Sequence, residues 1–118
     1  MTVTNSGLGE IANITIGSGT AFSYLAIGTG TGASNVTDTT LGTENDRSSA
    51  TVSRDTTSVA NDTSKFVKNF AFTGSVAVTE AGVFNDASTG VLLARSVFDA
   101  MNVVDGDSLE ISYFVTFG

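Results

Sequence analysis

The stretch TEAGVFNDASTGVLLAR, from Thr79 to Arg95, contains a turn signal between two runs of residues that favour β-structure. Its central residues NDASTG, at 85–90, include Asn, Asp and Gly, which tolerate the positive φ angles of a hairpin connection. The dipeptide Val83–Phe84 precedes the turn, and residues 91–98 follow it as the returning strand. The stretch therefore predicts a β-hairpin, and GluAlaGly at 80–82 predicts a bulge or kink in its first strand.

The segment just before this hairpin has the two-residue period of a strand. Phe66, Phe70 and Phe72 share one parity with Lys68. Successive side chains of a strand point to opposite faces, so the three rings lie on one face. We expect them to be buried against a second sheet.

A second hairpin signal, AspGlyAsp at 105–107, comes before the last strand. That strand carries bulky residues on both faces once Phe114 is counted, and we expect it to be central in its sheet. One of its faces consists of Leu109, Ile111, Tyr113, Val115 and Phe117.

The first half of the chain is richer in loop signals. Residues 22–27 predict a strand that ends at alternating glycines, and a Thr-, Asp-, Asn- and Gly-rich loop is expected to continue through residue 46. Residues 49–54 predict a short polar strand, and 54–65 an exposed loop. The apolar spacing of residues 8–16 suits either a helical turn or a strand.

Composition agrees with an all-β protein. The chain has 118 residues, of which 41% are hydrophobic and only 14% are charged, and it is rich in Thr and Gly. Thr and Val fit a pleated surface, while good helix formers are scarce. We predict one domain over residues 1–118, an antiparallel β-sandwich or jelly-roll, with residues 1–21 as an N-terminal arm or first strand.

Charge and residue types exclude several function classes. A net charge of −7 opposes binding to nucleic-acid phosphates. The chain has neither His nor Cys, which removes the usual Ser–His and Cys–His machinery and thiolate metal sites. We expect no enzyme activity and no cofactor. The start of the chain lacks the pattern of a secretory signal, and no run is long enough to span a membrane, so synthesis in the cytoplasm and no membrane partner are expected.

Three local features are candidate sites. The GTGTG run at 28–32 resembles a phosphate-binding loop only superficially, because the Lys of a P-loop is missing, and we interpret its glycines as structural. Asp105 and Asp107 are the candidates for a metal ion, although Asp in turns usually hydrogen-bonds its own backbone. Arg95, in an apolar strand, is expected to pair with a carboxylate such as Glu80 across the sheet, or else to face a neighbouring subunit.

Several motifs, taken in order, resemble a group of short virion structural proteins of tailed bacterial and archaeal viruses. The resemblance extends from Tyr24 to Phe117, and it implies a β-sandwich or jelly-roll that decorates the head shell as a homotrimer. TEAGVFND is also similar to the N-terminal module of tail-collar fibre proteins. The motifs are YLAIGTGT at 24–31, DTTLGTE at 38–44 with Arg47, FTGSVAVTEAGVFND at 72–86, LLARSVF at 92–98 and VDGDSLEISY at 104–113.

The function that this resemblance implies is a capsid decoration or turret-base protein, which binds the major capsid protein on the virion head and stabilises the shell. A tail-fibre or baseplate attachment module is the alternative, and a free carbohydrate-binding β-sandwich is a third possibility. We expect residues 55–64 to project outward. Contacts with neighbouring subunits or the capsid are expected at the N-terminal segment and the glycine loop, with Thr2, Val3, Leu8, Gly28, Gly30 and Gly32 as candidates.

Overall fold

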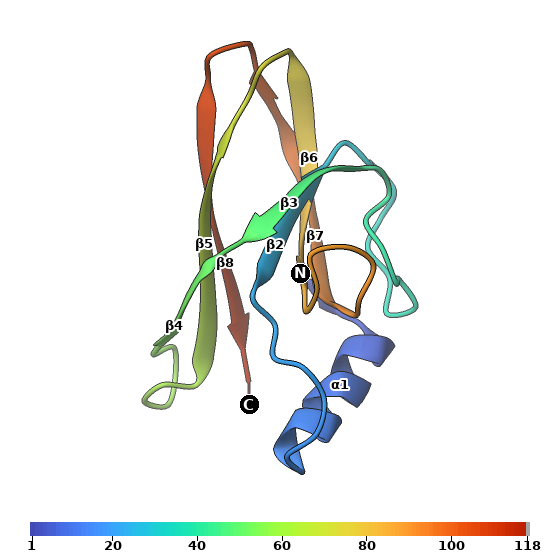
Figure 1. Ribbon diagram of the computed structural model, residues 1–118, viewed down its shortest axis with the longest axis vertical. Coiled ribbons are helices and arrows are strands. Elements are labelled where there is room, and N and C mark those ends of the chain that lie inside the picture. Colours follow the sequence, from blue (N-terminus) through green and yellow to red (C-terminus); the bar gives the residue numbers. More distant parts are fainter. Residues whose placement is uncertain (118) are drawn as a thin grey trace.

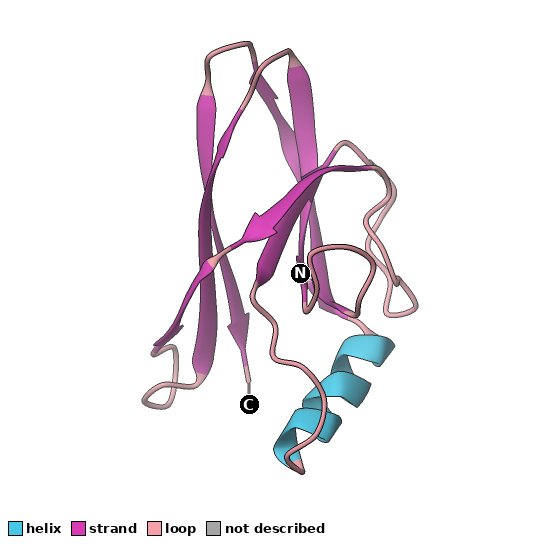
Figure 2. Cartoon of the chain, in the orientation of Figure 1, coloured by secondary structure: helices cyan, strands magenta, loops and turns pink. Residues whose placement is uncertain are grey.

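A computed structural model describes residues 1–117, which form two facing antiparallel sheets with one short helix at one end (Figures 1 and 2). One sheet has the strand order β1-β7-β6-β2-β3, and the other has the order β4-β5-β8. The predicted antiparallel β-sandwich is therefore confirmed. The elements are β1 (Thr2–Val3), α1 (Asn5–Thr15), β2 (Tyr24–Gly28), β3 (Glu44–Ser49), β4 (Thr51–Asp55), β5 (Thr63–Ala71), β6 (Val76–Phe84), β7 (Leu92–Val103) and β8 (Ser108–Thr116).

The two sheets are joined at one side and separate at the other. Only Ala50 lies between β3, which pairs with β2, and β4, which pairs with β5. The chain thus passes directly from one sheet to the other, as the green ribbon in Figure 1 shows. At the opposite side, β8 is the outer strand of its sheet, and β7 does not pair with it.

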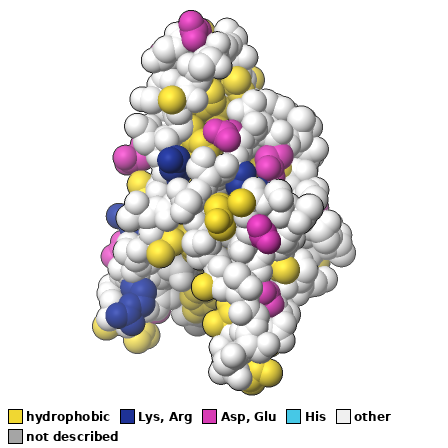
Figure 3. Space-filling view, in the orientation of Figure 1, with side chains coloured by type: hydrophobic (Ala, Val, Ile, Leu, Met, Phe, Trp, Pro, Cys, Tyr) yellow, Lys and Arg dark blue, Asp and Glu magenta, His cyan; other side chains and the backbone are white. Residues whose placement is uncertain are grey.

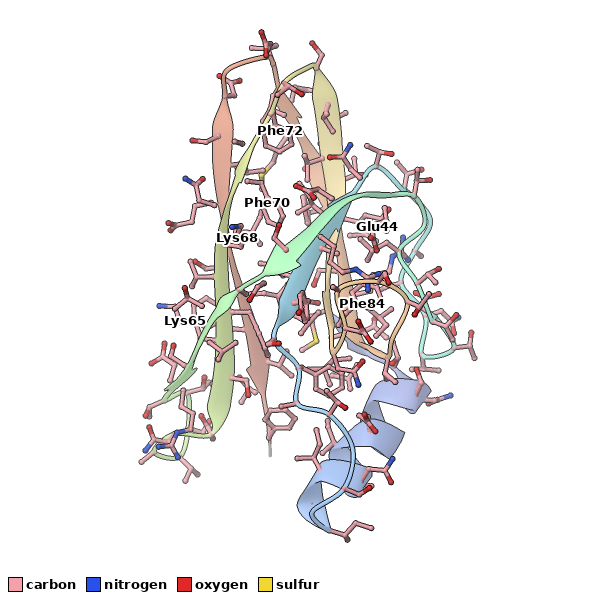
Figure 4. All side chains as sticks on the ribbon, in the orientation of Figure 1. Glu44, Lys65, Lys68, Phe70, Phe72 and Phe84 are labelled. Carbon is pink, nitrogen blue, oxygen red and sulfur yellow. The ribbon has the colours of Figure 1, made fainter. Side chains whose placement is uncertain are left out.

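The core between the sheets contains the three predicted rings. Phe66, Phe70 and Phe72 are all buried, and Phe70 and Phe72 lie between the two sheets (Figure 4). Burying a Phe side chain contributes roughly 1.5–3 kcal/mol. Their neighbours in the core include Leu25, Ile27, Val78, Val83, Ile111 and Val115.

A second, smaller core lies on the outer face of the five-stranded sheet. Ala26, Phe84 and Leu92 come from the strands, and Leu41 comes from the connection between β2 and β3. All four are buried. This connection, residues 29–43, therefore covers the sheet instead of projecting into solvent.

Both hairpin predictions are confirmed by backbone geometry. Thr89 and Gly90 have φ angles of 54° and 73° in the β6–β7 turn, and Gly106 has a φ of 89° in the β7–β8 turn. The irregularity in β6 falls between Val78 and Glu80, so it begins one residue earlier than the predicted bulge. β7 is also longer than the strand predicted from residues 91–98.

Two strand predictions are wrong. The last strand, β8, is an edge strand and not a central one, and Phe114 on its outward face is 45% exposed. Bulk on both faces indicated burial, but no strand covers the open edge of β8 within residues 1–117, and the Lys65 ammonium lies 5.5 Å from the centre of the Phe114 ring. The loop expected through residue 46 ends earlier, because β3 begins at Glu44 and pairing with β2 orders a polar segment.

The ambiguity over residues 8–16 is resolved in favour of a helix, α1, which starts before them. Thr4 caps it, since its hydroxyl accepts a hydrogen bond from the Gly7 amide at 2.9 Å. The same hydroxyl donates to the Leu92 carbonyl at 2.5 Å, which ties the helix start to β7. Gly7 allows this close approach, because a Cβ there would lie 2.6 Å from the Leu93 carbonyl oxygen.

The two glycines of α1 make a matched pair of variants. Gly7→Ala should lower the free energy of unfolding by about 1–3 kcal/mol, because the added methyl group overlaps backbone atoms of β7. Gly9→Ala should raise it by up to about 1 kcal/mol, since nothing lies within 4 Å of the new Cβ and Ala favours the helix. Urea unfolding of both variants measures the difference, and equal effects would contradict the packing of α1 on β7.

Candidate functional site

The outer face of the five-stranded sheet holds a buried ion pair. Glu80 on β6 and Arg95 on β7 lie on neighbouring strands, and the Arg95 Nε donates to Glu80 Oε1 at 2.8 Å. The Glu80 side chain is fully buried and Arg95 is 3% exposed. The expected pair across the sheet is therefore confirmed as an intramolecular contact.

The Glu80 carboxylate also binds three backbone amides of the connection 29–43. Gly30 N–H donates to Oε2 at 2.6 Å, Gly42 N–H to Oε1 at 2.7 Å, and Thr43 N–H to Oε2 at 2.8 Å. Gly30 lies near the start of the connection, and Gly42 and Thr43 lie at its end. One side chain thus brings both ends of the connection together over the sheet.

Arg95 holds the middle of the same connection. Its guanidinium donates to the Gly32 carbonyl at 3.0 Å, the Ala33 carbonyl at 3.4 Å and the Asp38 carboxylate at 3.2 Å. Within residues 1–117, every buried side-chain nitrogen or oxygen has a hydrogen-bond partner. A buried charge is tolerated when it is paired and fully hydrogen-bonded, and both members of this pair meet that condition.

The glycines of the GTGTG run have a specific role here. A Cβ at Gly28 would lie 2.6 Å from Glu80 Oε2, and one at Gly30 would meet the same oxygen and the backbone of Gly42. Nothing lies within 4 Å of a Cβ at Gly32. Gly28 and Gly30 are needed because the backbone approaches the carboxylate closely, which agrees with the structural interpretation of this run.

The protonation of the pair follows from these contacts. Burial by itself would raise the pKa of Glu80. The amides of Thr43 and Gly42, together with Arg95, lower this pKa by more than burial raises it, so the net pKa lies below its ordinary value of 4.5. Burial would lower the pKa of Arg95, but Glu80 and Asp38 outweigh it and raise that pKa. Both groups are therefore charged at neutral pH.

Arg47 on β3 forms a second contact between distant segments. Its guanidinium lies 3.5 Å from the centre of the Phe84 ring. The same group binds the Glu44 carboxylate, with 2.6 Å between Arg47 Nη2 and Glu44 Oε1. The same group donates to the carbonyls of Asp86 and Thr89 in the β6–β7 turn, at 3.1 and 2.7 Å. Arg47 thus links β3 to the hairpin that follows β6.

The helix is tied to that hairpin by Glu10. Its carboxylate accepts hydrogen bonds from Asn13 at 3.0 Å, from the Thr20 amide at 3.1 Å and from Asn85 at 2.8 Å. The bond from Asn13, followed by that from Thr20, lowers the pKa of Glu10 below its ordinary value. The Glu10 carboxylate is therefore ionised at neutral pH, in the form that accepts these bonds.

The loop between β4 and β5 is exposed, as expected, and it is ordered by one carboxylate. The backbone amides of Thr57, Ser58 and Val59 all donate to Asp62 at 2.9–3.0 Å. The Val59 bond and then the Thr57 and Ser58 bonds hold the pKa of Asp62 well below its usual range. This loop folds on itself through its own backbone.

The two metal candidates lie in the β7–β8 turn, where Asp107 accepts a hydrogen bond from the Val104 amide at 2.9 Å. In the described part of the chain, no three Asp or Glu side chains gather closely enough to hold a metal ion. Asp107 therefore acts as a turn residue. No helix within residues 1–117 is long and apolar enough to cross a membrane.

The candidate interface residues differ in how accessible they are. Thr2 and Val3 form β1 and pair with Arg95 and Ala94 of β7, and Leu8 on α1 is 56% exposed. Gly32 is exposed as well. Gly28 and Gly30 are buried against Glu80, so within this chain their backbone is occupied by an intramolecular contact.

A hollow on the open side of the sandwich was not predicted from the sequence. It has a volume of about 490 Å³ and lies between β7 and β8. Its floor includes Tyr113, whose hydroxyl accepts a hydrogen bond from Ser96 at 2.9 Å; burial raises the pKa of Tyr113 to about 12. The lining is mostly apolar and includes Phe98, Met101, Ile111 and Phe114.

Comparison of the chain with protein-family models, with curated proteins and with solved structures finds no match.

Replacing Glu80 tests its role as the anchor of the connection 29–43, which it holds through the amides of Gly30, Gly42 and Thr43. Glu80→Gln keeps the shape but leaves Arg95 buried beside a neutral amide, and one oxygen that accepts backbone hydrogen bonds becomes a donor. The free energy of unfolding should fall by about 3–5 kcal/mol. Glu44→Gln, in the more exposed pair with Arg47, should cost less than about 1 kcal/mol. Urea unfolding of both variants measures the contrast, and a Glu80→Gln protein as stable as the parent would refute the anchor.

The lowered pKa of Glu80 also predicts a dependence of stability on pH. A carboxylate whose pKa is lower in the folded state than in the unfolded state stabilises the fold at pH values above about 4.5. That contribution is lost as pH falls from about 4.5 through the folded pKa, because protonation removes the negative charge that the three amides and Arg95 stabilise. Unfolding free energies measured from pH 6 to pH 3 should decrease, and the decrease should be smaller in Glu80→Gln.

Proposed function

We propose that this chain is a virion structural protein of a tailed virus, and that it decorates the capsid by binding the outer surface of the major capsid protein shell. The proposal starts from the resemblance of its motifs to short virion proteins. One observation carries it further: residues from four separate motifs meet at the Glu80 anchor.

These residues come from distant parts of the chain. Gly30 belongs to YLAIGTGT, Gly42 and Thr43 to DTTLGTE, Glu80 to TEAGVFND and Arg95 to LLARSVF, and each of the other four residues donates a hydrogen bond to Glu80. The order and spacing of the motifs therefore reflect one three-dimensional framework. Because the four motifs meet in one framework, the proposal treats their resemblance to virion proteins as a single resemblance and not as four separate short matches.

The surface charge supports a place on the outside of a shell. Acidic side chains are spread over the face drawn in Figure 3, and the net charge of the chain is −7. Such a surface would be repelled by packaged DNA inside the head. A position on the outer face avoids that repulsion.

The test is addition of the purified protein to head shells, lacking it, of the virus whose genome encodes the chain. We expect saturable binding at a fixed number of copies per capsid protein, and a higher temperature of shell disruption. An unrelated β-sandwich of similar size and net charge controls for adsorption. Failure to bind shells, combined with co-purification with tails, would contradict the proposal and favour the tail-fibre alternative.

A further inference from the structure

The outer edge of β8 is open and has few of the features that keep edge strands apart. Among residues 1–117, no strand pairs with this edge. β8 contains neither Pro nor Lys, and Glu110 is its one charged residue. Soluble proteins usually protect long edges with Pro, Lys or bulges, because the unpaired N–H and C=O groups bind other strands.

The hydrogen-bond pattern shows which groups of β8 face outward. Phe72 N–H donates to the Asp107 carbonyl at 2.9 Å, and Phe117 N–H donates to the Asp62 carbonyl at 3.0 Å. These bonds extend the β5–β8 ladder at its two ends, and alternate residues of an antiparallel strand bond to the same neighbour. The odd-numbered residues of β8 therefore bond to β5, and the backbone groups of the even-numbered residues point to the open edge.

We propose that the open edge of β8 pairs with the same edge of a second copy of this chain, antiparallel and centred on Ser112, to form a two-fold dimer with one continuous sheet. In this register Ser112 lies opposite itself, Glu110 lies opposite Phe114 of the second copy, and all of β8 is paired. A two-fold interface must match itself in this way.

Charge complementarity selects this register. Lys65 lies on the outward face, away from the core (Figure 4), and its ammonium is 5.5 Å from the centre of the Phe114 ring. With Glu110 of the second copy beside that ring, the carboxylate comes next to the ammonium across the interface. Among residues 1–117, neither Lys65 nor Glu110 has an ion-pair partner within the chain. A dimer centred on Glu110 would instead set two carboxylates opposite each other.

The inward face of β8 supports the same pairing. Ile111 and Tyr113 line the hollow and would lie opposite Tyr113 and Ile111 of the second copy. Phe98 and Met101 of β7 line the same hollow, and Met101 is 42% exposed. Pairing of the two edges brings the apolar linings of both copies together, so apolar surface leaves water.

A charge-swap experiment on the full chain tests the dimer without any shell. Sedimentation velocity over a concentration series should show a monomer–dimer equilibrium for the parent. Glu110→Lys and Lys65→Glu should each raise the dissociation constant by about tenfold or more, because each creates a like-charge pair that occurs twice in the interface. The double variant, Lys65→Glu with Glu110→Lys, should restore the dimer, because it restores opposite charges across the interface. The two residues form no ion pair within one chain, so the exchange removes none from the monomer.

Ser112→Pro provides a second, independent variant. The amide of Ser112 points to the open edge, so the substitution removes no hydrogen bond of the monomer but blocks the centre of the interface. Circular dichroism checks that each variant is folded. A parent that is monomeric or trimeric, a dimer unaffected by the single variants, or a double variant that stays monomeric would overturn the proposal. This test does not depend on the virion role, so the two proposals can fail separately.

Discussion

The Glu80 carboxylate is the contact on which the outer layer of this protein depends. It is buried, it accepts hydrogen bonds from the amides of Gly30, Gly42 and Thr43, and it pairs with Arg95. The connection 29–43 has no helix or strand of its own. Charge-assisted hydrogen bonds from backbone amides replace secondary structure as the source of its order. Leu41 can then complete the small core over Phe84 and Leu92.

This arrangement explains why the sequence combines glycines with a buried charge. A side chain at Gly28 or Gly30 would occupy the space of the Glu80 carboxylate, and without the carboxylate the two ends of the connection would lose their common acceptor. The glycine run and the acidic residue therefore depend on each other, although 50 residues separate Gly30 from Glu80. Four of the motifs that resemble virion proteins thus meet in one framework around Glu80.

The two sides of the sandwich differ for a topological reason. The direct passage from β3 to β4 closes one side, because a single residue between the strands keeps the sheets together there. At the other side the chain passes from β7 to β8 through the AspGlyAsp turn, far from the middle of either strand, and the sheets stay apart around the hollow. The unpaired backbone of β8 and the apolar lining of the hollow are consequences of the same opening. We propose that a second copy covers both.

The sequence by itself determined the all-β class, the two hairpins and the buried face of Phe66, Phe70 and Phe72. It indicated the pair between Glu80 and Arg95 but left a contact of Arg95 with a neighbouring subunit open. Each depends on local turn chemistry, on the two-residue period of a strand, or on the rule that a charge in an apolar strand needs a partner of opposite charge. The tertiary structure alone decided that residues 29–43 fold over the sheet, that β8 is an edge strand, and that Gly28 and Gly30 are buried. These features depend on which strands become neighbours, and a long-range contact leaves no periodic signal in the residues that make it.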